Sequence, residues 1–383
     1  MDSNPTTIQN QFLRDYWDII GGFIFLLLTL FFHYYSHASL LSTLTSAIAI
    51  ILFSITVSEI ADILAERLSE PYGSFVLTFS AVAVEIILLF SIMLQSHNSP
   101  DAIETVKGGI ISAVIVDMNV LLGLAVFIGG LSFTEQQHNE DTSSSYTTIL
   151  YVAALALLVP SILGHSEHSE EIIKEASFLI GGLLFLFYLV ILIFQTKTHT
   201  HFFKSTARSR MFRFKRKQLE QEEEVHDSYI FDNISNIYNF IAIFVFIFLI
   251  GILAEMFAHD GLVIFNQFGI SIGLAGLTIA IISVSPEIFT AIRAAKNDQI
   301  QRVINIAMGA STVSILLTVP MLLILGYLAG ISLPLSFNPL EIGALIFTII
   351  LAWKTTDDGE TNYFEGISHL MLFLAYAVIA GLY

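Results

Sequence analysis

Long, continuous apolar runs are the feature of this sequence that most limits what it can fold into. A helix that crosses the hydrocarbon of a bilayer needs about 20 apolar residues, whereas the strands of a membrane barrel are short and alternate in polarity. The runs here are continuous, so we predict an all-α polytopic membrane protein with about 11 transmembrane helices. The runs cover residues 17–35, 40–64, 75–94, 110–131, 146–163, 176–194, 237–257, 268–292, 303–331, 340–353 and 367–383.

Composition agrees with this class and excludes several functions. Of the 383 residues, 55% are hydrophobic and only 13% are charged, which is far from the balance of a soluble protein. The absence of cysteine excludes disulfides and thiolate metal sites. Residues 1–15 have no basic start and no small-residue cleavage site, so we expect no signal peptide there. No phosphate-binding glycine loop and no His-Glu-x-x-His motif occurs, so an enzyme has little support.

The one long polar segment, residues 195–236, sets the expected orientation. It changes from basic to acidic (220–227) and carries half of the 16 Lys and Arg, so the positive-inside rule places it in the cytoplasm. Counting helices then puts the N-terminus in the cytoplasm and the C-terminus outside. Among all Lys and Arg only Lys107 and Lys174 fall outside. We therefore expect a multi-pass protein of the cell (inner) membrane.

The same count divides the chain into two sets of five helices of opposite orientation, preceded by one leading helix. We expect an N-terminal tail and helix 1 (1–36), a first repeat (37–197), a cytoplasmic linker (198–233) and a second repeat (234–383). Inverted repeats that meet at a site near the bilayer midplane are typical of secondary transporters.

Two acids, Glu85 and Glu287, lie on the second helix of each repeat. A carboxylate at the bilayer centre costs about 3 kcal/mol, so each is a candidate functional residue. Small and hydroxyl residues share a helical face with each acid; they are Ser74, Thr78 and Ala81 before Glu85, and Gly273, Gly276, Ala280 and Ser283 before Glu287. Close helix packing explains such faces equally well.

Proline adds a backbone acceptor beside the second acid. Pro286 has no N–H, so the carbonyl of Ile282 loses its helical hydrogen-bond partner and becomes available as a cation ligand. The alternative is that Pro286 only kinks the helix. Glu287 precedes Arg293 by only six residues. A midplane position for Glu287 therefore requires that this helix either breaks or extends well past Arg293.

Further oxygen groups lie at membrane depth and suit hard cations better than zinc or copper. Asp62 and Glu255 lie near helix ends, where a solvated role is the alternative. Glu59 and Asp117 lie off the faces considered and are not assigned to the site. The tracts His165-x-x-His168 and His199-x-His201 are interpreted as solvated loops. The predicted supporting groups of the cation and proton pathway are Ser58, Asp62, Thr78, Asn119, Glu255, Ile282, Ser283, Ser285, Ser311 and Thr312.

At these residues the sequence resembles the bacterial calcium/proton antiporters of the ChaA type, within the calcium/cation antiporter superfamily. The resemblance covers about 51–383, and its most specific parts are Ala61 to Ser74, Gln195 to His199, Ser285-Pro286-Glu287, and Thr361-Asn362 through His369 to Tyr376. It implies one leading helix with two inverted five-helix repeats. It also implies that Glu85 and Glu287 bind the cation.

The chain departs from the superfamily at one point. In the superfamily, the acid of each repeat follows a Gly-Asn pair. In this chain the corresponding positions are Ala81-Val82 before Glu85 and Ser283-Val284 before Glu287. The resemblance implies exchange of calcium, sodium or potassium for protons, and the absent Asn ligands favour a sodium or potassium/proton exchanger as the alternative. A cation channel is a further alternative.

The expected mechanism is alternating access, with cation and protons competing for Glu85 and Glu287, because burial makes an ionised Glu costly. We expect no cofactor, only the transported calcium, sodium or potassium and protons. The expected partners are membrane lipid and the cations, with no nucleic acid, and the oligomeric state stays open.

Overall fold

The computed structural model describes residues 16–68, 72–97, 99, 101–164, 170–204 and 230–382. Within these ranges, 11 helices are long and apolar enough to cross a membrane. The chain is therefore a polytopic membrane protein, as its apolar runs predict. The N-terminal tail 1–15, the tract from His165 to His168 and the acidic run 220–227 lie outside the described residues.

The leading span is α2 (Trp17–Phe31) extended by the π-helical η1 (Phe32–Ser36). The first repeat then contains α3 (Ser39–Arg67), α4 (Tyr72–Leu94) with η2 (Gln95–His97), the continuous span α5 (Ala102–Ile115), η3 (Val116–Leu121) and α6 (Leu122–Phe133), α7 (Glu140–Gly164), and α8 (Glu170–Ile193) with η4 (Phe194–Thr198). The linker contributes η5 (Thr200–Phe203) and α10 (Ile230–Asn233).

The second repeat has the same order of spans. It contains α11 (Asn236–Phe268), α12 (Ile272–Lys296), the continuous span α13 (Ile300–Val313), η6 (Ser314–Thr318) and α14 (Val319–Ala329), α15 (Pro339–Thr356), and α16 (Tyr363–Leu382). In both repeats the third span is interrupted by a π-helical segment at its middle. This correspondence, one leading helix and two sets of five, is the predicted architecture.

Several helices extend beyond the apolar runs that predict them. The run 237–257 belongs to α11, whose 33 residues exceed the about 20 that the hydrocarbon of a bilayer requires. The short run 340–353 lies within α15, a span of 18 residues that begins with a capping box between Asn338 and Glu341.

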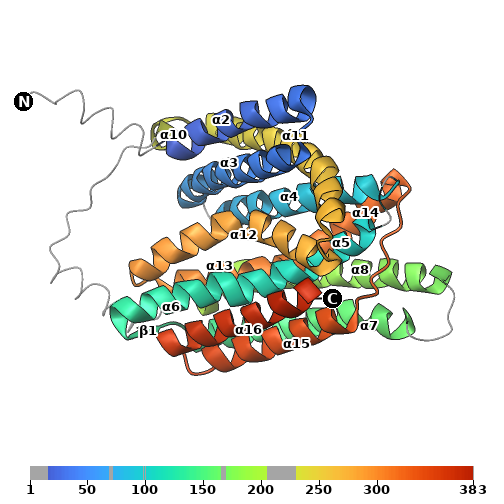
Figure 1. The fold of residues 1–383 in the computed structure, drawn as a ribbon. Helices are drawn as coiled ribbons and strands as arrows, with labels where there is room; N and C mark the ends of the chain where they lie inside the picture. Colours follow the sequence, from blue (N-terminus) through green and yellow to red (C-terminus); the bar gives the residue numbers. More distant parts are fainter. Residues whose placement is uncertain are drawn as a thin grey trace, which may run out of the picture.

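The two acid-bearing helices lie inside the bundle. In Figure 1, α2, α3 and α11 lie along one side, α6, α15 and α16 lie along the opposite side, and α4 and α12 run between them. The backbones of α12 and α5 are in close contact at Gly276, where an added Cβ would lie 2.7 Å from Gly108 C and from Gly109 N. The small face of α12 is thus a helix interface, as the packing alternative predicts.

A two-stranded antiparallel sheet ties the two repeats together at the linker end of the bundle. Strand β1 (Glu135–Gln137) pairs with β2 (Glu360–Asn362), with Gln136 opposite Thr361. The side chain of Gln136 also donates hydrogen bonds to the carbonyl oxygen of Ala295 and to Asp298, just after the acid-bearing α12. The end of α12 is therefore held by both repeats.

Candidate functional site

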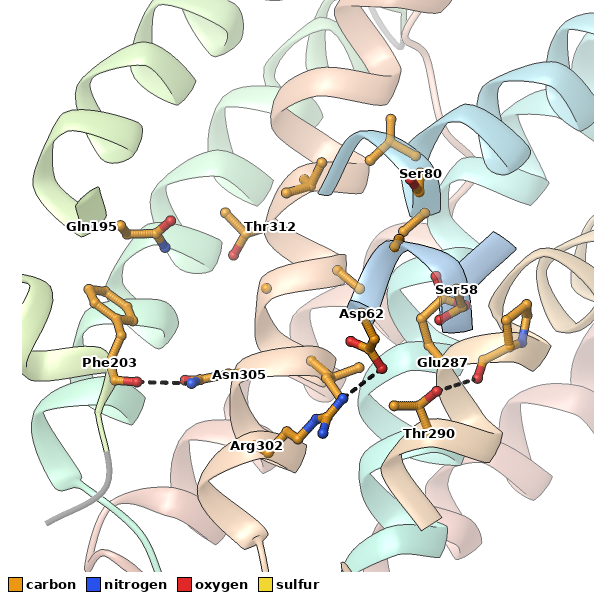
Figure 2. A pocket seen from close by; sticks show the side chains of 18 of the residues that line it. Ser58, Asp62, Ser80, Gln195, Phe203, Glu287, Thr290, Arg302, Asn305 and Thr312 are labelled. Atoms are coloured by element: carbon orange, nitrogen blue, oxygen red, sulfur yellow. Dashed lines mark hydrogen bonds and ion pairs between the residues drawn. The ribbon is translucent and has the colours of Figure 1, made fainter. Parts of the chain in front are cut away.

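A cavity of about 670 Å³ lies between the two repeats, lined by α3, α4, α12, α13 and the end of α8 (Figure 2). Its lining extends from Glu287 to Arg302 and Lys204, at the end of the bundle where the linker attaches. Four of the predicted supporting residues, Ser58, Asp62, Ser283 and Thr312, line this cavity together with Glu287.

Glu287 lies on a helix that continues without interruption through Pro286, from Ile272 to Lys296. The helix therefore does not break, and it ends at Lys296, three residues past Arg293, so it does not extend well past Arg293 either. Thr290 Oγ1 donates a hydrogen bond of 3.1 Å to the carbonyl oxygen of Pro286 (Figure 2). Within the described chain, the buried Oε2 of Glu287 has no hydrogen-bond partner. Ile282 and Ser285 are buried on the same helix.

Glu85 lies behind the cavity wall, which α4 forms with Ala81, Val82 and Val84. Its side chain is only 8% exposed. Oε2 accepts hydrogen bonds from Ser314 Oγ at 2.8 Å and from Thr318 Oγ1 at 3.0 Å, both on η6. Oε1 is buried and has no partner among the described residues. The first repeat thus supplies the carboxylate and the second supplies its hydroxyl donors.

Asp117 is a third buried acid, and the sequence alone did not place it in the site. It lies on η3, is 1% exposed, and accepts a hydrogen bond of 3.2 Å from Ser311. It interacts electrostatically with both Glu287 and Glu85. A π-helical turn inserts an extra residue, so side-chain faces counted with α-helical spacing are wrong beyond it. The available signal in the sequence was an Asp inside the apolar run 110–131, which corresponds to the run that carries Ser311 and Thr312 in the other repeat.

The remaining predicted residues have other surroundings. Asn119 is buried but donates to Thr348 Oγ1 at 2.8 Å and pairs with His369 Nδ1 at 2.9 Å, so it joins η3 to α15 and α16. Glu255 lies on an exposed face of α11 and does not line the cavity. The side chain of Thr78 lies outside the described part of the chain, although its backbone belongs to α4.

Two ion pairs at the linker end involve the acids of α3. Asp62 pairs with Arg302 at 2.7 Å at the cavity mouth (Figure 2), and Glu59 pairs with Arg293 at 3.0 Å. By contrast, within the described ranges none of Glu85, Asp117 and Glu287 forms an ion pair with a basic side chain. Three carboxyl groups without basic partners are therefore grouped in the interior of the bundle.

A buried carboxyl group without a basic partner is tolerated when it is protonated or when it holds a cation. Among the described residues, the side chains that donate hydrogen bonds to Asp117 and Glu85 are the hydroxyls of Ser311, Ser314 and Thr318. Carboxyl and hydroxyl oxygens suit hard cations. Inverted helical repeats around such a group define an ion-transporting membrane protein.

The chain belongs to the sodium/calcium exchanger protein family. The model of that family matches residues 38–197 and 238–382, which are the two sets of five helices.

Individual relatives agree with this assignment. The chain is 27% identical over 338 residues to the sodium-potassium/proton antiporter ChaA of Escherichia coli, with 87% of each chain covered. It is 24% identical over 366 residues to a Ca²⁺/H⁺ antiporter of Aphanothece halophytica, with 94% of each chain covered.

The fold is also that of two solved structures. The structure of native YfkE matches with a TM-score of 0.77 at 19% identity, covering 96% of this chain and all of that chain. The H⁺/Ca²⁺ exchanger CAX matches with a TM-score of 0.73 at 15% identity, covering 97% of this chain and 91% of that one.

Proposed function

We propose that this protein exchanges a cation, calcium and/or sodium or potassium, for protons by alternating access. The observation that carries the proposal is the group of three buried carboxyl groups, Glu85, Asp117 and Glu287, without ion-pair partners among the described residues. Each group is stable in the interior either with a proton or beside a cation. Cation and protons therefore compete for the same oxygens, and this competition couples their movements.

Glu287 and Glu85 have different parts in this scheme. Glu287 lines the cavity, so a cation that enters from the linker end meets this carboxylate before it reaches Glu85. Glu85 lies behind the wall and receives Ser314 and Thr318 from the other repeat. A relative movement of the repeats would change the access of solvent to these acids, which is the requirement of alternating access.

The names of relatives include both monovalent cations and calcium. Because the Gly-Asn pairs are replaced by Ala81-Val82 and Ser283-Val284, the neighbouring oxygen ligands are fewer than a calcium site favours. A sodium or potassium/proton exchanger with little calcium activity is therefore the second candidate.

We place the protein in the cell (inner) membrane, with the linker end and the N-terminus in the cytoplasm and the C-terminus outside. Arg67, Arg293 and Arg302 lie at this linker end and support the assignment. We propose that the two repeats comprise residues 37–197 and 234–383. We also propose that the protein is a transporter and not an enzyme, and that it requires no cofactor and binds no nucleic acid.

Purified protein in liposomes with a pH-sensitive dye tests the function. An outward or inward gradient of calcium, sodium or potassium is applied in turn, and the movement of protons against their own gradient is recorded. Uphill proton movement supports an exchanger, whereas a channel moves protons only downhill. Absence of coupled proton movement with all three cations contradicts the proposal.

Variants then test the site. Glu85→Gln and Glu287→Gln keep the side-chain shape but remove the charge, so each should abolish exchange. Glu175→Gln, at an exposed position of α8, is the matched control and should retain it. Full exchange in either site variant would refute the role of that carboxylate.

A further inference from the structure

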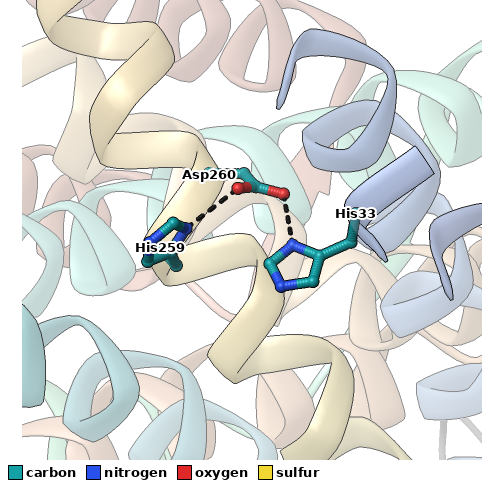
Figure 3. Close-up of side chains that lie close together, drawn as sticks. All are labelled: His33, His259 and Asp260. Carbon is teal, nitrogen blue, oxygen red and sulfur yellow. Dashed lines mark hydrogen bonds and ion pairs between the residues drawn. The ribbon is translucent and has the colours of Figure 1, made fainter. Parts of the chain in front are cut away.

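A second group of ligand-type side chains lies away from the transport cavity, between α2 and α11. His33 belongs to η1, and His259 and Asp260 are consecutive on α11 (Figure 3). His33 Nδ1 lies 2.8 Å from Asp260 Oδ2, and His259 Nδ1 lies 2.9 Å from Asp260 Oδ1. One ligand atom from each of the three side chains lies within 4.8 Å of the others. Among the described residues this is the only such group of three.

Both helices place this group near the membrane surface opposite the linker. The span from Trp17 to Ser36 has 20 residues, so His33 lies in its final turns. α11 begins at Asn236, beside the linker, and about 20 residues of it cross the hydrocarbon. His259 and Asp260 therefore lie just past the far side of the hydrocarbon. The residue counts along the leading span and along α11 thus place the three side chains at the same depth relative to the membrane.

The exposure of the three residues suits a site with one open side. The Asp260 side chain is 7% exposed and the His33 side chain 20%, whereas that of His259 is 59% exposed. The carboxylate is thus held in the protein and both rings can be reached from solvent. A bound ion would have three protein ligands and a free position for water, as in zinc sites with an open position.

The ligand types differ from those of the transport cavity. Two imidazoles and one carboxylate favour zinc and similar divalent transition metals, whereas the acids and hydroxyls around Glu287 favour hard cations. In the structure each imidazole lies within hydrogen-bond distance of the carboxylate through Nδ1. A neutral ring that binds a metal through Nδ1 carries its proton on Nε2, so coordination needs only a tautomer change and no oxidant or reductant.

We propose that His33, His259 and Asp260 form a binding site for a divalent transition-metal ion, separate from the transport cavity. In the proposed orientation the site faces the outside of the cell. Since η1 belongs to the leading span and α11 to the second repeat, the bound ion connects these two helices. Zinc-site bonds are about 2.0–2.2 Å long, so the rings would move towards a shared centre when the ion binds.

Cobalt binding to the purified, chelator-treated protein in detergent tests this proposal. Co²⁺ replaces Zn²⁺ as a coloured probe, and its visible absorption reports bound ion and its coordination. We expect His33→Gln and His259→Gln each to lose one equivalent of bound Co²⁺ relative to the unmodified protein. His97→Gln removes an exposed histidine at the end of η2 and should lose none. Equal binding by all four proteins would overturn the proposal.

Two further measurements distinguish a transition-metal site at these residues from a hard-cation site and from nonspecific metal binding. An equal concentration of Ca²⁺ should leave the bound Co²⁺ in place, and displacement by Ca²⁺ would contradict the assigned metal class. Zn²⁺ should raise the Tm of the unmodified protein and of His97→Gln but not of His259→Gln, because ligands that bind only the folded state stabilise it. His259 is largely exposed, so its replacement leaves the helix packing intact. An equal rise in His259→Gln would also contradict the site.

Discussion

Ser311 of the second repeat donates a hydrogen bond of 3.2 Å to Asp117 of the first. Ser314 and Thr318, one and two turns further along the same span, donate to Glu85. One span of the second repeat therefore supports two acids of the first. This arrangement makes the surroundings of both acids dependent on the relative position of the repeats.

Asp117→Asn should reduce proton-coupled cation exchange by roughly tenfold or more, equivalent to about 1.4 kcal/mol. The amide keeps the shape of the side chain but can neither carry the exchanged proton nor neutralise a cation. Dye-reported exchange in liposomes measures the effect. Asp141→Asn, at an exposed position of α7, is the control. Unchanged exchange in Asp117→Asn would remove this residue from the mechanism.

Ser314→Ala combined with Thr318→Val should raise the apparent KM for the cation by roughly a hundredfold or more. Hydrogen bonds to a charged group contribute about 1.5–3 kcal/mol each, and the ionised Glu85 loses two of them. The measurement is the dependence of exchange rate on cation concentration. Thr278→Val removes a hydroxyl on an exposed face of α12 and should leave KM as it is. A double variant with unaltered KM would show that these hydroxyls do not position the carboxylate.

Gly276→Ala should lower the Tm of the protein, because the added Cβ would lie 2.7 Å from the backbone of α5. Forcing extra volume into such a contact costs about 1–3 kcal/mol. Gly182→Ala is the matched control, since nothing lies within 4 Å of its added Cβ, and helix propensity favours Ala there. Measured in detergent, the Tm of Gly276→Ala should therefore be lower than the Tm of Gly182→Ala. Equal Tm values for the two variants would contradict the close contact.

Arg302→Gln should lower the apparent KM for the cation about two- to fivefold at low ionic strength. The substitution removes a positive charge from the cavity mouth, where Arg302 pairs with Asp62 at 2.7 Å. The effect should shrink at high salt, because exposed charges are screened. Lys354→Gln, whose partner is Asp357, removes a charge away from the cavity and serves as the control. A higher KM in Arg302→Gln would mean that the arginine assists cation entry.

Much of the fold followed from local properties of the chain. Apolar runs of the length of a bilayer predicted the helices, and the distribution of Lys and Arg predicted two sets of five with opposite orientation. The cost of a buried acid pointed to Glu85 and Glu287. The π-helical segments could not be predicted in this way, and they decide which side chains face the site. From the sequence, none of Asp117, Ser314 and Thr318 is assigned to the site, and all three lie in these segments.

Hydrophobicity and the cost of a buried charge depend on residue type, so local sequence was enough to predict the membrane class, the number and order of the spans, and the two acids. The groups that meet in the interior follow from tertiary packing. It placed Asp117 beside Ser311, directed Asn119 towards His369, left Glu255 exposed, and brought His33 to Asp260 from the other end of the chain. Such meetings depend on how helices distant in sequence pack and rotate, and no local pattern contains that information.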